Sequence, residues 1–170
     1  GTESAYLTAR LNTNKYMNLA ATNAEATDGA LDMDFQSGFG DSASSAVANY
    51  QAWMFRRAKG FFDVVTYTTT PSSSAQTDVV THNLGVAPEL IIVKNRSGTG
   101  NIWMTYNSVS GVNKYLQIES NNAVATGTWS FPSAPTATQF TTGYAYPSGT
   151  SAIAVLFATV AGISKVGSYT

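Results

Sequence analysis

Two stretches of this chain share one sequence pattern, and this repetition limits the available folds more than any other feature. NKYMNLAATNAEAT begins at Asn14, and NKYLQIESNNAVAT begins at Asn113. A second pair follows in the same order, with WMFRRAKGFFDVVTYT at Trp53 and VLFATVAGISKVGSYT at Val155. The matching residues lie 99 positions apart in the first pair and 102 in the second. This small shift corresponds to a short loop insertion within a repeat of about 100 residues.

The repeat also predicts how the chain is organised. Units of about 100 residues are too long for solenoid repeats and have the size of small β-domains. We predict that residues 1–59 form the C-terminal half of a first unit and that residues 60–170 form a complete β-sandwich unit. The two parts are expected either as separate units or packed together as one domain.

Alternating apolar and polar residues predict β-strands throughout the chain. The segments that show this pattern or a β-branched, aromatic composition are 5–11, 15–20, 48–58, 61–70, 78–82, 89–95, 102–107, 112–120, 138–146, 152–161 and 163–170. Residues 44–57 are the one stretch that competes as a helix, and their match to a strand-like segment argues against it. Turn signals recur every 8 to 12 residues or so, which is typical of sandwiches and barrels. We therefore predict an all-β fold, an antiparallel β-sandwich of jelly-roll-like type, with a partial internal repeat.

Composition excludes several classes of function. Charged residues make up only 11% of the chain, the net charge is −1, and no basic stripe is present, so we expect no nucleic-acid partner. The chain has no cysteine, which excludes disulfides, cysteine-zinc sites and thiol nucleophiles. No stretch of about 18 consecutive apolar residues occurs, so we expect no membrane insertion.

The motifs FFDVVTYT, HNLGVAPELIIVKN, KYLQIESNNAVAT, PTATQFTTG and FATVAGISKVGSYT together resemble a β-rich module of tailed-bacteriophage structural proteins, especially those of marine phages. The resemblance covers residues 61–170 well and the first 60 residues only through the repeat. It implies a virion component without enzymatic activity, such as a tail fibre, a tail spike or a head-decorating protein. Asn83 departs from the family pattern, where glycine is common, but asparagine tolerates left-handed backbone angles.

His82 is the only histidine, so any Ser-His-Asp triad would have to use it. No G-x-S-x-G motif accompanies it, and no second histidine is available for a metal site. We interpret the segment from His82 as a structural turn in which Gly85 takes a positive φ and Pro88 stiffens the exit.

Acidic residues offer two further sites, and neither is favoured. Asp28, Asp32 and Asp34 could approach one Ca²⁺, a hard cation that takes six to eight oxygen ligands. Their spacing is not that of an EF-hand, and a solvated acidic loop explains them better. A glycosidase needs two carboxylates across a cleft, and no pair stands out. We therefore predict no catalytic residue, no metal site and no cofactor.

Three residues are candidates for an interface or a ligand contact. Arg56 and Arg57 lie in an apolar stretch where the second copy has Ala158 and Thr159. They are expected either to meet a partner carboxylate or subunit, or to carry charge on an exposed edge strand that resists aggregation. Trp129 follows a Gly-Thr turn and could be an exposed platform for a sugar, although such residues more often fill a core.

The leading functional hypothesis is a non-enzymatic virion protein that is exposed on the particle after assembly in the host cytoplasm, most simply a tail fibre or receptor-binding module. Head decoration or fibre anchoring is the first alternative, and a glycan-binding module is the second. The expected partners are other virion proteins, a host surface glycan, and further copies of the chain in a homo-oligomer, because a chain without disulfides gains stability from association. The resemblance favours a trimer, since many fibre proteins are trimers.

Overall fold

The computed structural model describes residues 5–12, 14–27, 31–32, 38, 40–41, 52–73, 75–99 and 101–168. In this part of the chain the protein is all-β, and its only helical element is a short 3-10 turn, η1. The elements are β1 (Tyr6–Leu7), η1 (Arg10–Asn12), β2 (Lys15–Asn18), β3 (Ala26–Thr27), β4 (Leu31–Asp32), β5 (Gly40–Asp41), β6 (Phe62–Thr68), β7 (Asp78–Thr81), β8 (Leu90–Asn95), β9 (Met104–Asn107), β10 (Lys114–Gln117), β11 (Ala125–Thr126), β12 (Gln139–Thr142) and β13 (Ser151–Phe157).

The centre of the fold is a six-stranded antiparallel sheet in the order β11-β10-β9-β8-β13-β6. β13 lies inside this sheet and pairs with β6 on one side and β8 on the other. Because successive strand residues point to opposite faces, Ala154 and Leu156 of β13 enter one core while Ile153 and Val155 enter another.

The first core lies under a two-stranded sheet made of β7 and β12. Its fully buried members include Leu84, Ile91 and Phe131. Tyr146 is also buried there, and its hydroxyl donates to the carbonyls of Val93 and Ile102 at 2.9 Å each. Each large side chain buried in this way stabilises the fold by about 1.5–3 kcal/mol.

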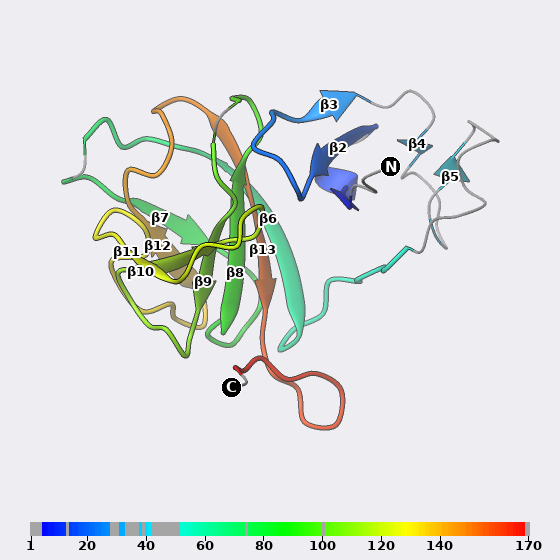
Figure 1. Cartoon of the computed structure of the whole chain (residues 1–170). Helices are drawn as coiled ribbons and strands as arrows, with labels where there is room; N and C mark the ends of the chain where they lie inside the picture. Colours follow the sequence, from blue (N-terminus) through cyan, green and yellow to red (C-terminus); the bar gives the residue numbers. More distant parts are fainter. Residues whose placement is uncertain are drawn as a thin grey trace.

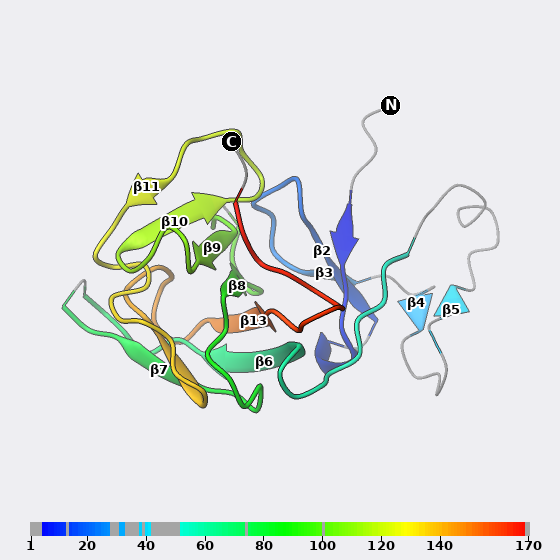
Figure 2. The ribbon, with the colours of Figure 1, turned by 90° about the horizontal axis from the view of Figure 1, so that it is seen from below.

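The second core is covered by the N-terminal meander, the three-stranded sheet β1-β2-β3. Met17 of β2 is completely buried against Phe62, Val64, Ile153 and Val155. Figure 1 shows β2 and β3 on one side of the six-stranded sheet and β7 and β12 on the other, and Figure 2 shows the same layers from below. The predicted antiparallel β-sandwich is therefore confirmed, with a meander from the N-terminal part as an additional layer.

The repeated sequences adopt matching local backbones. Lys15 pairs with Thr27 in β2–β3, and Lys114 pairs with Thr126 in β10–β11, at the same spacing. The residue before each of these strands, Asn14 or Asn113, has a φ of 57°.

The second repeated pair also matches in structure. An isolated bridge joins Ala58 to Phe62, and another joins Val160 to Ser164. The glycines inside these two turns, Gly60 and Gly162, have φ values of 78° and 76°. Gly60 therefore lies in a tight turn between Ala58 and Phe62. The assignment of residues 1–59 and 60–170 to two units stays a prediction.

Three expected strands differ from the structure. Only Tyr6–Leu7 of the segment 5–11 forms a strand, and its end is the 3-10 turn η1. Residues 52–57 of the segment 48–58 lie outside every strand and are exposed. Residues 165–168 of the segment 163–170 are also outside strands. A strand requires a hydrogen-bonded neighbour, and the described residues supply none for these two segments.

Candidate functional site

The most elaborate polar arrangement lies where the β2–β3 loop meets the end of β8. We call it the junction cluster and define it as Lys15, Glu25, Lys94, Arg96 and Trp103. These side chains come from the N-terminal meander and from the six-stranded sheet. The cluster therefore joins segments that are far apart in the sequence.

Trp103 holds the β2–β3 loop against the sheet through hydrogen bonds. Its indole is completely buried, and Nε1 donates to the carbonyls of Asn18 at 3.0 Å and Ala21 at 3.1 Å. The backbone N–H of Trp103 donates to Oε2 of Glu119 at 3.1 Å. A buried tryptophan with a satisfied N–H contributes both apolar area and a specific orientation.

Lys94 lies beside Trp103 and is itself completely buried. Its Nζ donates to the carbonyl of Thr22 at 3.1 Å and to the carbonyl of Asn101, and it lies 5.8 Å from the centroid of the Trp103 ring. Burial lowers the pKa of Lys94, and the Glu119 carboxylate partly offsets this effect. The ammonium group is thus used to tie the β2–β3 loop to the sheet.

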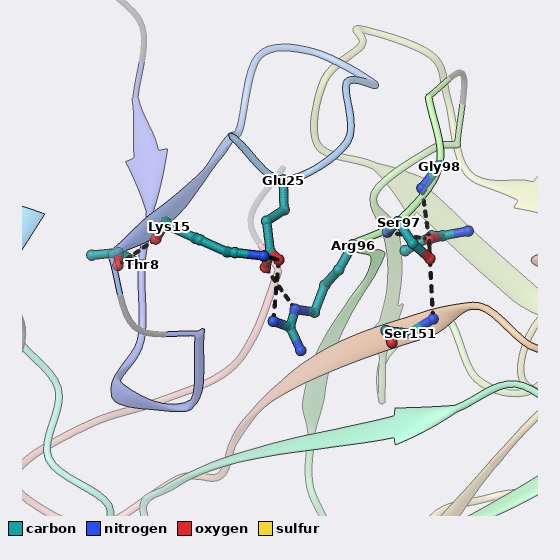
Figure 3. Close-up of polar contacts among 8 residues, drawn as sticks. Thr8, Lys15, Glu25, Arg96, Ser97, Gly98 and Ser151 are labelled. Carbon is teal, nitrogen blue, oxygen red and sulfur yellow. Dashed lines mark hydrogen bonds and ion pairs between the residues drawn. The ribbon is translucent and has the colours of Figure 1, made fainter. Parts of the chain in front are cut away.

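Glu25 lies between Lys15 and Arg96, as Figure 3 shows. Its carboxylate accepts from Lys15 Nζ at 2.8 Å and from Arg96 Nε at 2.7 Å and Nη2 at 3.2 Å. The backbone N–H of Glu25 donates to the carbonyl of Arg96 at 2.9 Å. Burial favours a higher pKa for Glu25, but the hydrogen bonds and charges of Arg96 and Lys15 outweigh it, so the pKa is lowered. The carboxylate is therefore ionised and fully engaged.

A hollow of about 380 Å³ opens beside this ion pair. Its lining consists of Lys15, Ala24, Glu25, Arg96, Ser97 and Ser151. Ser97 Oγ accepts from the backbone N–H of Ser151 at 3.1 Å (Figure 3). Asn95 Oδ1 accepts from the N–H groups of Ser97 and Gly98. The hollow presents hydroxyls and charged groups, which suits a polar ligand better than an apolar one.

Within the described part of the chain, no basic side chain lies in hydrogen-bond contact with Ser97 or Ser151. The Glu25 carboxylate accepts from Lys15 and Arg96. Among the residues that the structure describes, no group of three or more His, Asp or Glu side chains could hold a metal ion. Likewise, no helix within the described ranges is long and apolar enough to cross a membrane.

Several of the residues predicted from the sequence come together at the opposite end of the sheet. Arg57 Nε lies 2.6 Å from Oδ1 of Asp63, whose other oxygen accepts from the backbone N–H of Asn83 at 2.8 Å. The N–H of Gly60 donates to the carbonyl of Leu84 at 2.7 Å. The ion pair therefore fastens the turn after His82 to the turn that precedes β6.

His82 lies within this turn and is buried. Its Nδ1 accepts from the N–H of Leu84 at 3.2 Å, and its ring stacks on Phe140 with centroids 6.3 Å apart. Burial lowers the pKa of His82, against the opposing influence of Asp63 and the backbone of Thr136. Gly85 has a φ of 80°, as predicted, and Pro88 is buried at the exit of the turn. Asn83 does not adopt the left-handed angle that its family position suggested.

The remaining candidate residues from the sequence are Arg56, Trp129 and the three aspartates. Arg56 is exposed and makes no hydrogen bond or ion pair with the described residues. Trp129 is half-buried and packs on Tyr115 with ring centroids 4.9 Å apart, so it is not the exposed platform considered above. A Cβ at Gly127 would come within 2.9 Å of its ring, which explains the glycine there. Asp28 and Asp34 lie outside the described residues, and so does the side chain of Asp32.

Sequence reasoning missed the junction cluster. Lys94 follows the apolar run of LIIVKN. Its place in this strand-like run was the one sequence signal that its side chain faces inward. The pairing of Glu25 with Arg96 spans 71 residues, and no sequence pattern announces it.

One comparison with known proteins places the chain in a family. A family model described as "Domain of unknown function (DUF7483)" matches residues 42–170, which is well over half of the chain. No curated protein matches the chain, and no solved structure does. On the strength of the family match, the chain belongs to the DUF7483 family.

Proposed function

We propose that the chain is a non-enzymatic structural module of a bacteriophage virion, most simply part of a tail fibre or receptor-binding protein. The observation that carries the proposal is the junction cluster, in which the β2–β3 hairpin is held on the six-stranded sheet. Apolar packing around Met17 and polar contacts around Lys94 and Glu25 act on the same hairpin.

This joint suits a protein whose role is mechanical. Trp103 and Lys94 are completely buried and bind backbone carbonyls of the hairpin loop, so the loop cannot shift without leaving buried polar groups unpaired. The Glu25 ion pair closes the outer rim of the same contact. A fixed angle between successive units is what an extended fibre requires.

The candidate groups for chemistry are used structurally, which supports the non-enzymatic part of the proposal. The Glu25 carboxylate accepts from two cations, and the His82 ring is buried against Phe140. The phage assignment rests on the sequence motifs described above.

The experiment is to locate the protein on purified particles. Mass spectrometry of gradient-purified virions should detect it in stoichiometric amount, and electron microscopy with a specific antibody should label tails. Labelling of heads would support the alternative of head decoration or fibre anchoring. Absence from purified particles, with the protein present in the infected-cell lysate, would contradict all of these assignments.

A second candidate function is binding of a host surface glycan in the hollow beside Glu25. The polar lining of Ser97, Ser151 and Lys15 favours it. Titration with host polysaccharide should then give saturable binding that Ser151→Phe abolishes, because the larger side chain at this exposed position fills the hollow. Equal binding by the variant and the wild type would exclude the hollow as the site.

A further inference from the structure

Residues 52–57 are exposed to solvent and begin with an apolar run, Ala52 to Phe55. Trp53 is 77% exposed, Met54 is 62% exposed and Phe55 is 48% exposed. The backbone of this segment makes no hydrogen bond within the described part of the chain. Exposure of three consecutive large apolar residues usually marks a contact surface.

The counterpart of this segment in the second copy of the repeat is buried. Trp53, Met54 and Phe55 correspond to Val155, Leu156 and Phe157 of β13 at the 102-residue spacing. Val155 is 4% exposed and Leu156 is 0% exposed, because β13 lies between β6 and β8 with both of its faces covered. Residues 52–57 therefore carry the sequence pattern of a central strand but lack its neighbours among the described residues.

A second segment, residues 164–168, also lacks a strand partner among the described residues. Residues 164–168 correspond to the start of β6 and follow a turn with the same bridge and glycine conformation as the turn before β6. They belong to no strand, and the N–H of Val166 donates to the Thr159 side chain. They cannot join β13 of their own chain, because β6 and β8 already occupy both of its edges.

We propose that residues 52–57 of one copy pair antiparallel with residues 164–168 of a second copy, as β13 pairs with β6. Shifting the observed register by the repeat spacing gives four opposed pairs. They are Phe55 with Ser164, Met54 with Lys165, Trp53 with Val166, and Ala52 with Gly167.

This pairing has physical consequences for the assembly. It gives ladder hydrogen bonds to two segments that lack them and covers Trp53 and Met54. The two surfaces differ, so the contact is heterologous and leads to a ring or a filament in place of a symmetric dimer. The inference goes beyond the virion proposal and does not depend on it, because it concerns copies of this chain alone.

Directed cross-linking tests the register, since the chain has no cysteine of its own. Ala52→Cys protein is mixed with Gly167→Cys protein under mild oxidation. Both positions are exposed, and a Cβ at Gly167 meets no atom within 4 Å. The matched control mixes Ala52→Cys with Ser168→Cys, in which the second thiol lies on the opposite face of the proposed strand.

We expect the disulfide between positions 52 and 167 to form several times faster than the control disulfide between 52 and 168. Equal rates for the two pairs, or no mixed disulfide in either, would overturn the proposed pairing.

Sedimentation equilibrium tests the association without any engineered thiol. The average mass of the wild type should rise with concentration, and Trp53→Asp should move that rise to a concentration about tenfold higher or more. Val109→Asp is the control, because Val109 is 61% exposed and belongs to neither segment. A wild type that stays monomeric throughout, or equal shifts for the two variants, would contradict the proposal.

Discussion

The two hairpins that begin at Asn14 and Asn113 share a backbone but not an environment. Both have the same strand pairing and the same φ before the first strand. Met17 of the first hairpin is completely buried against the six-stranded sheet, whereas its counterpart Leu116 is only half-buried.

The same contrast extends to the hairpin loops. Glu25 is held by two cations in the junction cluster, whereas its counterpart Val124 is 44% exposed. The hairpin geometry is therefore a property of the local sequence, and burial depends on what lies against the hairpin. The second hairpin forms the edge of the six-stranded sheet, because β10 pairs with β9, whereas the first hairpin covers one face of that sheet.

The largest expected effect comes from removing the anchor of the first hairpin. Trp103→Ala should lower the free energy of unfolding by about 3–5 kcal/mol, because it leaves a large cavity and unpairs the carbonyls of Asn18 and Ala21. Urea denaturation followed by circular dichroism measures this loss. Val109→Ala is the control and should cost little, since Val109 is exposed. Similar losses for the two variants would show that Trp103 does not anchor the hairpin.

A direct comparison of the equivalent strand residues comes next. Met17→Ala should cost about 2–5 kcal/mol, as buried truncations do, and Leu116→Ala about half as much because its side chain is only half-buried. The same denaturation experiment measures both values. If Leu116→Ala costs as much as Met17→Ala, the two hairpins do not differ in burial in solution.

Glu25, whose counterpart in the second hairpin is Val124, predicts that the free energy of unfolding depends on pH. Glu25→Gln should cost about 1.5–3 kcal/mol at neutral pH, because the negative charge that pairs with Lys15 and Arg96 is lost. The folded-state pKa of Glu25 lies below its ordinary value, so the unfolded chain binds the proton more readily.

The stability that Glu25 contributes is therefore present above its unfolded pKa and is lost as the pH falls through the lowered folded pKa. Unfolding free energies measured from about pH 7 down to about pH 3 should show the wild type and Glu25→Gln converging at acid pH. A difference that stays constant over this range would exclude ionisation of Glu25 as its cause.

The smallest expected loss of stability comes from the left-handed asparagine that begins each hairpin. Asn14→Ala and Asn113→Ala should each cost about 1–2 kcal/mol, because both place a Cβ in the left-handed region that asparagine tolerates. The matched glycine variants should be close to wild type, since glycine has no Cβ. Thermal unfolding of the four variants tests this. Unequal costs at the two positions would mean that the surroundings, and not the local backbone, determine the turn.

Several parts of the fold could be predicted because they depend on neighbours in the sequence. The strands within 61–70 and 89–95 follow from β-branched and alternating residues, and the positive φ of Gly85 follows from its turn. The absence of a sequence partner for catalysis led to the prediction of a structural role for His82, which agrees with its burial against Phe140 and stays a prediction.

The rest required contacts between distant residues. Lys94 is among the most buried side chains, a position that its residue type argues against. Its partners are a carbonyl 72 residues earlier and the ring of Trp103. Residues 52–57 were predicted as a strand from composition, but a strand forms only where another strand offers hydrogen bonds.

The sequence alone therefore determined the strand-forming segments, the turns and the two equivalent hairpins, because these follow from backbone preferences and from the two-residue period of a strand. Only the tertiary structure decided which hairpin is buried, which charges are paired and which strand-like segment stays exposed. The physical reason is that burial and ladder hydrogen bonds each require two segments in contact. A single stretch of sequence specifies only one of the two.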